Sequence, residues 1–157
     1  MRYVHFALVV GCTVGCSGAD PAPSAHVESA TPDSLTPADD SLDDLTITVA
    51  YDDGDGDLGG GTASIYDCRA DDLVTTLQLP LIAPEGVVKD NDEITGTLDL
   101  HVNDVGDVAS TTLASKCSEL GVAPLSAGQT VFCIELTDVA GHVGHGDCTP
   151  AITIVGM

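Results

Sequence analysis

The sequence predicts an all-β fold, an antiparallel sandwich of seven strands with one short helix inserted before the sixth strand. Two observations support this prediction. Short runs in which aliphatic and β-branched residues alternate with polar ones recur along the second two thirds of the chain, and clusters of Gly, Pro, Asn and Asp separate them. Strands of this length and spacing typically pair in two facing antiparallel sheets. Because the chain has no Trp and few other aromatic residues, we expect a core of small aliphatic side chains.

The expected strands begin at residue 45, where Leu, Ile and Val alternate with Thr and Ala. Alternation is strict in residues 94–102, and the penultimate run places Phe132, Ile134 and Leu136 on one face. The seven expected strands are residues 45–51, 62–68, 73–79, 87–88, 94–102, 129–138 and 151–155. Strict pairing of the last two would put their apolar residues on opposite faces, so we expect a bulge or a different register there.

The expected helix begins at Asp107, which can cap it, and runs to Leu120, with Gly121 as its stop. Its apolar face would carry Ala109, Leu113, Cys117 and Leu120.

The N-terminus has the pattern of an export signal. Arg2 precedes a short apolar run, and small residues precede a cysteine. Residues 1–15 therefore resemble the signal peptide of a bacterial lipoprotein, which implies that Cys16 is lipidated and that the chain is anchored to a membrane, the outer membrane being expected. Cys12 is the alternative lipidated residue, and a plain secretory signal cut near Ala19 is a further alternative.

Residues 16–44 are rich in Pro, Ser, Ala and Asp and contain no Lys or Arg. This composition predicts a disordered acidic tether, which leaves residues 45–157 as the folded domain.

Four cysteines remain in the expected domain, and an even number in an exported chain indicates disulfides. If the last two strands form a hairpin, Cys133 and Cys148 are equally far from its midpoint. We therefore predict the bridges Cys133–Cys148 and Cys68–Cys117. The competing interpretation joins Cys68 to Cys133 across the two sheets.

The exported chain carries three basic residues, Arg69, Lys89 and Lys116, against 25 acidic ones. Such a surface repels nucleic acid and anionic membranes, whose phosphates are bound by Lys and Arg. It favours cations or basic partners, and it is also typical of adaptation to high salt.

One loop is rich in potential metal ligands, because residues 52–57 consist of four aspartates and two interspersed glycines. Short carboxylates in glycine-rich turns can converge on Ca²⁺, which prefers oxygen ligands. We predict one Ca²⁺ site here, completed by carboxylates from the connection after the fifth strand, and a solvated acidic turn is the alternative. The expected ligands are Asp52, Asp53, Asp55, Asp57, Asp104 and Asp107.

A second loop contains His142, His145 and Asp147, which could supply three ligands to a transition metal such as zinc. Three glycines make this segment equally typical of a polar hairpin tip.

The strand that runs into Asp-Gly-Asp-Gly-Asp-Leu-Gly, and the later strand that ends in Thr137-Asp138-Val139-Ala140-Gly141-His142, resemble bacterial immunoglobulin-like or fibronectin-III-like modules of surface lipoproteins. The resemblance covers residues 45–155 and implies a spacer or an adhesion and interaction module that recognises an unidentified protein or surface ligand. No nucleophile elbow, zinc-protease helix or phosphate-binding loop is present, so we expect no enzymatic activity. The alternative function is an exported protein that captures a metal or a basic partner through its acidic end.

Overall fold

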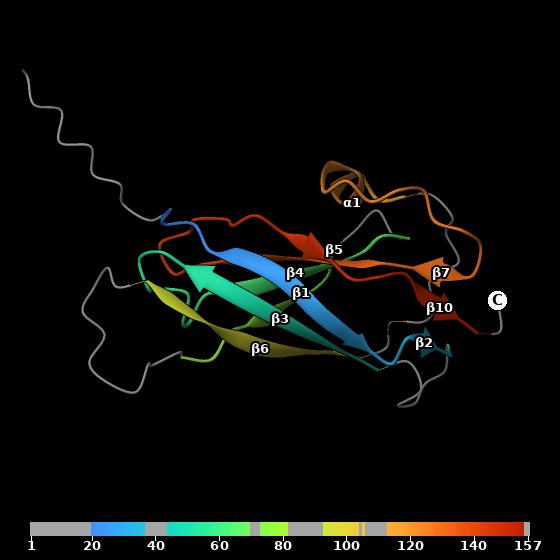
Figure 1. Ribbon diagram of the computed structural model, residues 1–157, viewed down its shortest axis with the longest axis horizontal. Coiled ribbons are helices and arrows are strands. Elements are labelled where there is room, and N and C mark those ends of the chain that lie inside the picture. Colours follow the sequence, from blue (N-terminus) through green and yellow to red (C-terminus); the bar gives the residue numbers. More distant parts are fainter. Residues whose placement is uncertain are drawn as a thin grey trace, which may run out of the picture.

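The computed structural model describes residues 20–36, 44–69, 73–81, 93–103, 105 and 113–155. In these residues the fold is all-β with one short helix, which confirms the predicted fold class at that level. The strands form two larger sheets and one small sheet at the end that carries β10 (Figure 1).

The first sheet has the order β1-β3-β6, and all its pairs are antiparallel. Its strands are β1 (Ser24–Thr31), β3 (Leu45–Asp53) and β6 (Ile94–Val102). In β3 the residues Leu45, Ile47 and Val49 are buried and alternate with half-buried Thr and Ala, as the sequence predicted.

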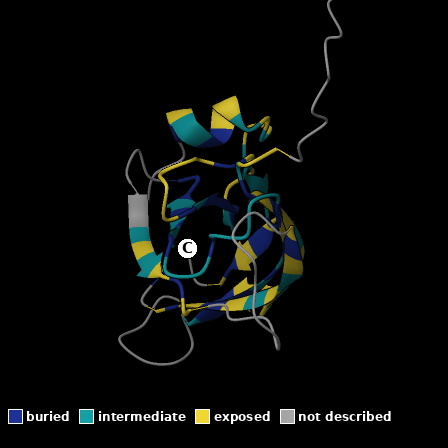
Figure 2. Cartoon of the chain, turned by 90° about the vertical axis from the view of Figure 1, so that its left-hand side faces the viewer, coloured by how far each residue is buried: buried dark blue, intermediate teal, exposed yellow. Residues whose placement is uncertain are grey.

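The second sheet has the order β5-β4-β8-β9 and is also antiparallel. Its strands are β4 (Thr62–Asp67), β5 (Leu73–Gln78), β8 (Phe132–Thr137) and β9 (Asp147–Cys148). Side chains of the first and second sheets meet in one aliphatic core, which also includes the buried ring of Phe132. Figure 2 shows these buried segments between exposed strips of the outer faces.

The small sheet explains the register problem that the sequence raised. The chain after β8 returns to pair with β8 through β9 (Asp147–Cys148), and then β10 (Ile152–Ile154) pairs instead with β7 (Gln129–Thr130) and β2 (Ser34–Leu35). This change of partner lets Ile152 and Ile154 join the same core as Phe132.

Residues 24–35 contradict the predicted disordered tether, because they form β1 and β2. β1 lies along the edge of β3, from Ser24 opposite Asp52 to Thr31 opposite Thr46. Leu35 is fully buried in the core. Composition favoured disorder, but a free strand edge supplies backbone hydrogen bonds that composition does not reveal. The folded domain therefore begins before residue 45.

The helix is shorter than predicted, since α1 covers Ser115–Glu119. Ala114 is extended, with φ −59° and ψ 142°, and its N–H donates to the Cys68 carbonyl, so no continuous helix runs from Asp107 to Leu120. Residues 106–112 and the expected strand 87–88 lie outside the described residues. Within the described ranges, no helix has the length and apolar character needed to cross a membrane.

Both predicted disulfides are present, Cys68–Cys117 and Cys133–Cys148. The first ties α1 to the end of β4, and the second joins directly paired residues of β8 and β9. They form a second buried cluster in which the Sγ atoms of Cys68 and Cys133 lie 3.5 Å apart.

Candidate metal centre

The loop after β3 turns back on itself around one aspartate and one leucine. Asp53 is the last residue of β3 and is fully buried. Its Oδ2 atom accepts a hydrogen bond of 2.8 Å from the Leu58 N–H, and the Leu58 side chain is itself fully buried in the core. Gly56 has φ 78°, a conformation that glycine adopts at little cost. The hydrogen bond and the two buried side chains therefore fix the loop at Asp53 and at Leu58, and Asp55 and Asp57 lie between these two residues.

A fourth carboxylate comes from the end of β8. Thr62 pairs with Thr137, so the start of β4 lies beside Asp138. A Cβ atom at Gly61 would overlap the Thr137 carbonyl oxygen and lie 3.0 Å from the Asp138 Cα atom, so only glycine permits this approach. The Val139 N–H donates to the Asp57 carbonyl at 3.3 Å and fixes the two segments against each other.

These segments bring four carboxylates together. Oxygen atoms of Asp53, Asp55, Asp57 and Asp138 all lie within 4.8 Å of one another. The Oδ1 atoms of the first three are buried and have no hydrogen-bond partner. Buried polar atoms are nearly always partnered, and an unpaired buried charge is costly. A positive group among these oxygens would provide the partner that they need.

The electrostatics of the cluster lead to the same conclusion. Burial raises the pKa of Asp53, and the nearby carboxylates of Asp55 and Asp138 raise it further, although the Leu58 N–H opposes the shift. Burial and then the charges of Asp138 and Asp55 likewise raise the pKa of Asp57. A cation among the four carboxylates would reverse both effects by stabilising the ionised forms.

His142 contacts the cluster from outside. Its N–H donates to Asp138 Oδ1 and its ring Nδ1 lies 2.8 Å from Asp138 Oδ2. The ring hydrogen bond to Asp138, and then the negative charge of that carboxylate, raise the pKa of His142. The two hydrogen bonds together hold the Asp138 side chain in place. Because a carboxylate oxygen has more than one lone pair, Asp138 remains able to bind a metal ion.

The ligand chemistry favours Ca²⁺. The four clustered side chains offer only carboxylate oxygens, which suit hard cations, whereas zinc sites in proteins rely mainly on Cys and His. Ca²⁺ takes six to eight oxygens in flexible geometry, so backbone carbonyls and water can complete the shell. The residues present therefore fit Ca²⁺.

The structure brings three predicted ligands together and places a fourth, Asp52, apart from them. Asp53, Asp55 and Asp57 share the cluster. Asp52 does not, because alternation along β3 leaves it exposed on the other face from Asp53. Asp104 and Asp107 lie outside the described residues.

The expectation that the connection after β6 begins at the same end of the sheet as the β3–β4 loop is wrong for a topological reason. β6 runs antiparallel to β3, so Ile94 lies opposite Asp53 while Val102 lies opposite Leu45. The connection after β6 therefore starts at the opposite end of the sheet from the carboxylate cluster. The carboxylate that completes the cluster comes instead from Asp138. This residue lies in the Thr137-to-His142 segment, whose sequence pattern predicted only a turn.

The predicted zinc ligands are not gathered at one point. His142 pairs with Asp138, whereas Asp147 accepts hydrogen bonds from His26 at 2.9 Å and from the Val27 N–H at 2.8 Å. Among the described residues, His142, His145 and Asp147 do not form a metal-binding group. His142 belongs instead to a group with Asp55 and Asp138, whose ligand atoms lie within 4.8 Å of one another, so the predicted set of three zinc ligands is not formed.

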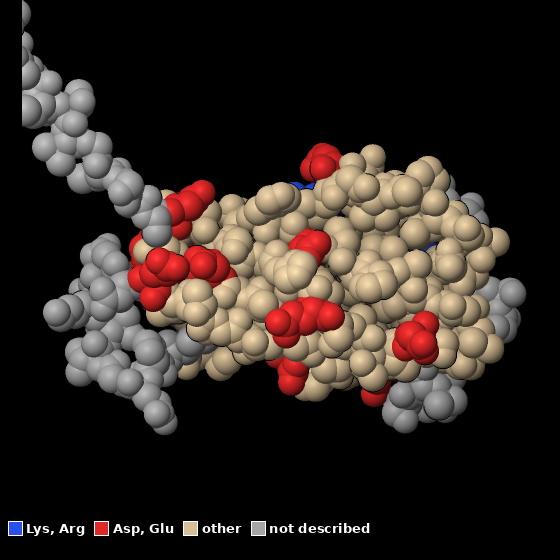
Figure 3. All heavy atoms as spheres, viewed as in Figure 1, with Lys and Arg blue, Asp and Glu red and all other residues tan. Residues whose placement is uncertain are grey.

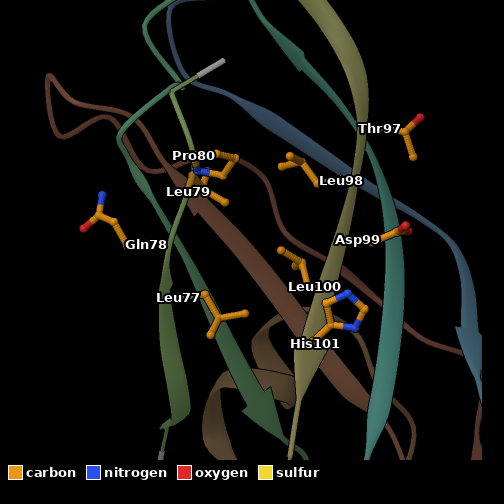
Figure 4. A pocket seen from close by; sticks show the side chains of 9 residues that line it. All are labelled: Leu77, Gln78, Leu79, Pro80, Thr97, Leu98, Asp99, Leu100 and His101. Atoms are coloured by element: carbon orange, nitrogen blue, oxygen red, sulfur yellow. The ribbon is translucent and has the colours of Figure 1, made fainter. Parts of the chain in front are cut away.

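A groove of about 420 Å³ lies between the outer strands β5 and β6. Figure 4 shows Leu98 and Leu100 pointing toward Leu77 and Leu79, while Asp99 is turned away from them. This groove is apolar and contains no converging charged groups, unlike the carboxylate cluster.

Comparison of the chain with protein-family models, with curated protein sequences and with solved structures finds no match.

Proposed function

We propose that this chain is an exported, non-catalytic β-sandwich module that binds one Ca²⁺ between the β3–β4 loop and the end of β8. The observation that carries the proposal is the set of three buried, unpartnered carboxylate oxygens, which lie with Asp138 within 4.8 Å of one another. The ion would hold two connections of the chain together. Its role is structural, because the oxygens that face it are buried.

The module is of the immunoglobulin-like type in this proposal. The sheet orders β1-β3-β6 and β5-β4-β8-β9 support it. They correspond to the strands A-B-E and C′-C-F-G of immunoglobulin domains. Modules of this kind serve as spacers or as adhesion and interaction units, and a Ca²⁺ ion that stiffens one end suits either role.

The module is anchored to the cell envelope through a lipid on Cys16. The signal-like residues 1–15 support this part of the proposal, as do the two disulfides, which form and persist outside the cytoplasm. Cells that express the chain with labelled palmitate are expected to incorporate label, and Cys16→Ser is expected to abolish it. Label that persists in Cys16→Ser but disappears in Cys12→Ser would move the anchor to Cys12, and an unlabelled parent chain would exclude anchoring.

The acidic end also permits the alternative function, capture of a basic partner. Figure 3 shows carboxylates gathered near the point where the described part of the N-terminal segment begins. Ca²⁺ would neutralise part of this charge, so a basic partner would bind more weakly in Ca²⁺. That dependence distinguishes the two functions.

Calorimetric titration of the full chain with CaCl₂ tests the proposed site. We expect one Ca²⁺ per chain, and we expect Asp53→Asn and Asp138→Asn each to weaken binding at least about tenfold, the lower end of effects seen for residues around metal sites. Asp52→Asn is the matched control, since it removes one neighbouring charge from an exposed position. An absence of binding, or an equal loss in Asp52→Asn and Asp53→Asn, would reject the site.

A further inference from the structure

The N-terminal segment is docked on the connection between β8 and β9. Pro23 is buried, and a Cβ atom at Gly144 would overlap the Pro23 carbonyl, so the two backbones are in direct contact. The Ala25 N–H donates to the His145 carbonyl at 3.2 Å. Two residues later the Val27 N–H donates to Asp147 Oδ2. These contacts hold the start of β1 against residues 144–147.

The same connection begins at a residue of the carboxylate cluster. Asp138 is the first residue of this connection. Its backbone N–H donates to the His142 carbonyl, and its side chain accepts a hydrogen bond from the His142 backbone N–H. The Gly144 N–H then donates to the Leu136 carbonyl at 2.9 Å. Only a few residues therefore separate the cluster from the surface on which the N-terminal segment lies.

The two features also share one end of the molecule. Ser24 pairs with Asp52, directly beside Asp53. Figure 1 shows β1 starting where β3 ends, while β10 and the C-terminus lie at the other end. The point where the N-terminal segment joins the domain is thus next to the carboxylate cluster.

We propose that Ca²⁺ at the carboxylate cluster clamps the N-terminal segment 23–27 onto the β8–β9 connection and so fixes the direction in which the chain leaves the domain. This inference rests on the proposed Ca²⁺ site. Without the ion, repulsion between Asp138 and the loop carboxylates favours separation of the two connections, which loosens the surface under Pro23. With the ion, both connections are drawn together and the segment is held.

Such coupling is reciprocal, because two events that stabilise one conformation must strengthen each other by the same factor. Ca²⁺ should slow opening of the N-terminal segment, and loss of the docked segment should weaken Ca²⁺ binding. Coupled sites typically change each other's equilibrium by about 5- to 150-fold. We expect an effect in that range here.

Hydrogen exchange of the full chain, in CaCl₂ and in chelator, tests the clamp without any substitution. The amides of Ala25 and Val27 are expected to exchange at least about fivefold more slowly in CaCl₂ than in chelator. The amide of Ile154 donates to the Gly128 carbonyl at the other end of the molecule, and it is the internal control that we expect to change less. If calorimetry shows Ca²⁺ binding but Ala25 and Val27 exchange at unchanged rates, the clamp is rejected and the site stands.

A variant tests the reciprocal effect. Asp147→Ala removes the acceptor of the Val27 N–H and is expected to weaken Ca²⁺ binding about fivefold or more. Asp99→Ala removes the same charge from an exposed position on β6 and is expected to change binding less than about twofold, because exposed charges are screened. Equal effects of the two substitutions would overturn the clamp, and a failure of the parent chain to bind Ca²⁺ would overturn both proposals.

Discussion

In Ca²⁺ at 100 times its dissociation constant, the full chain is expected to gain about 2.7 kcal/mol in free energy of unfolding relative to the chain in chelator. The gain arises because the unfolded chain cannot bring Asp53 and Asp138 together, so only the folded state binds the ion. Denaturant unfolding followed by circular dichroism measures the difference. Superimposable curves in Ca²⁺ and chelator would contradict the prediction, whereas curves that converge only in Asp138→Asn would support it.

The pH dependence supplies an internal check. In chelator the raised pKa values of Asp53 and Asp57 mean that the folded chain holds these protons more tightly than the unfolded chain does. Their contribution to stability is fully present below the unfolded pKa of 3.8 and is lost as the pH rises through the raised folded pKa values. In Ca²⁺, protons instead compete with the ion. The difference in unfolding free energy between the two conditions is therefore expected to shrink as the pH falls toward that window.

Replacing both Cys68 and Cys117 by Ala is expected to lower the free energy of unfolding by about 4 kcal/mol, the chain-entropy value for a bridge that spans about 50 residues. The sequence separation is 49, and both side chains are fully buried. Both cysteines must be replaced together, because a free Cys68 thiol would lie 3.5 Å from Cys133 and could exchange with its bridge. Chemical denaturation of the oxidised variant measures the loss.

The second bridge is the matched comparison. Cys133 and Cys148 are only 15 residues apart, so replacing both is expected to cost about 3 kcal/mol, less than the first pair. Mass mapping of each variant should recover the remaining native bridge. A larger loss from the shorter bridge would show that packing within the disulfide cluster, rather than restriction of the unfolded chain, sets the stabilisation.

The strands of the core could be predicted because their signal is local. Alternation in residues 45–51 and 94–102 matches β3 and β6 closely, since each inward residue needs an apolar side chain whatever strand lies beside it. The bridge Cys133–Cys148 could likewise be predicted from a hairpin that joins neighbouring segments. In contrast, the segment 24–31 has no apolar alternation strong enough to indicate a strand, and its pairing with β3 supplies most of its order.

The candidate site divides in the same way. Asp53, Asp55 and Asp57 are close in sequence, and the glycines between them already indicate a turn that can gather carboxylates, so the sequence by itself determined three of the four carboxylates of the site. Only the tertiary structure decided that Asp138 completes it and that the connection after β6 starts at the other end. The physical reason is that the end of a sheet at which a loop emerges depends on the directions and partners of strands that are distant in the chain, and local residue patterns carry no record of those partners.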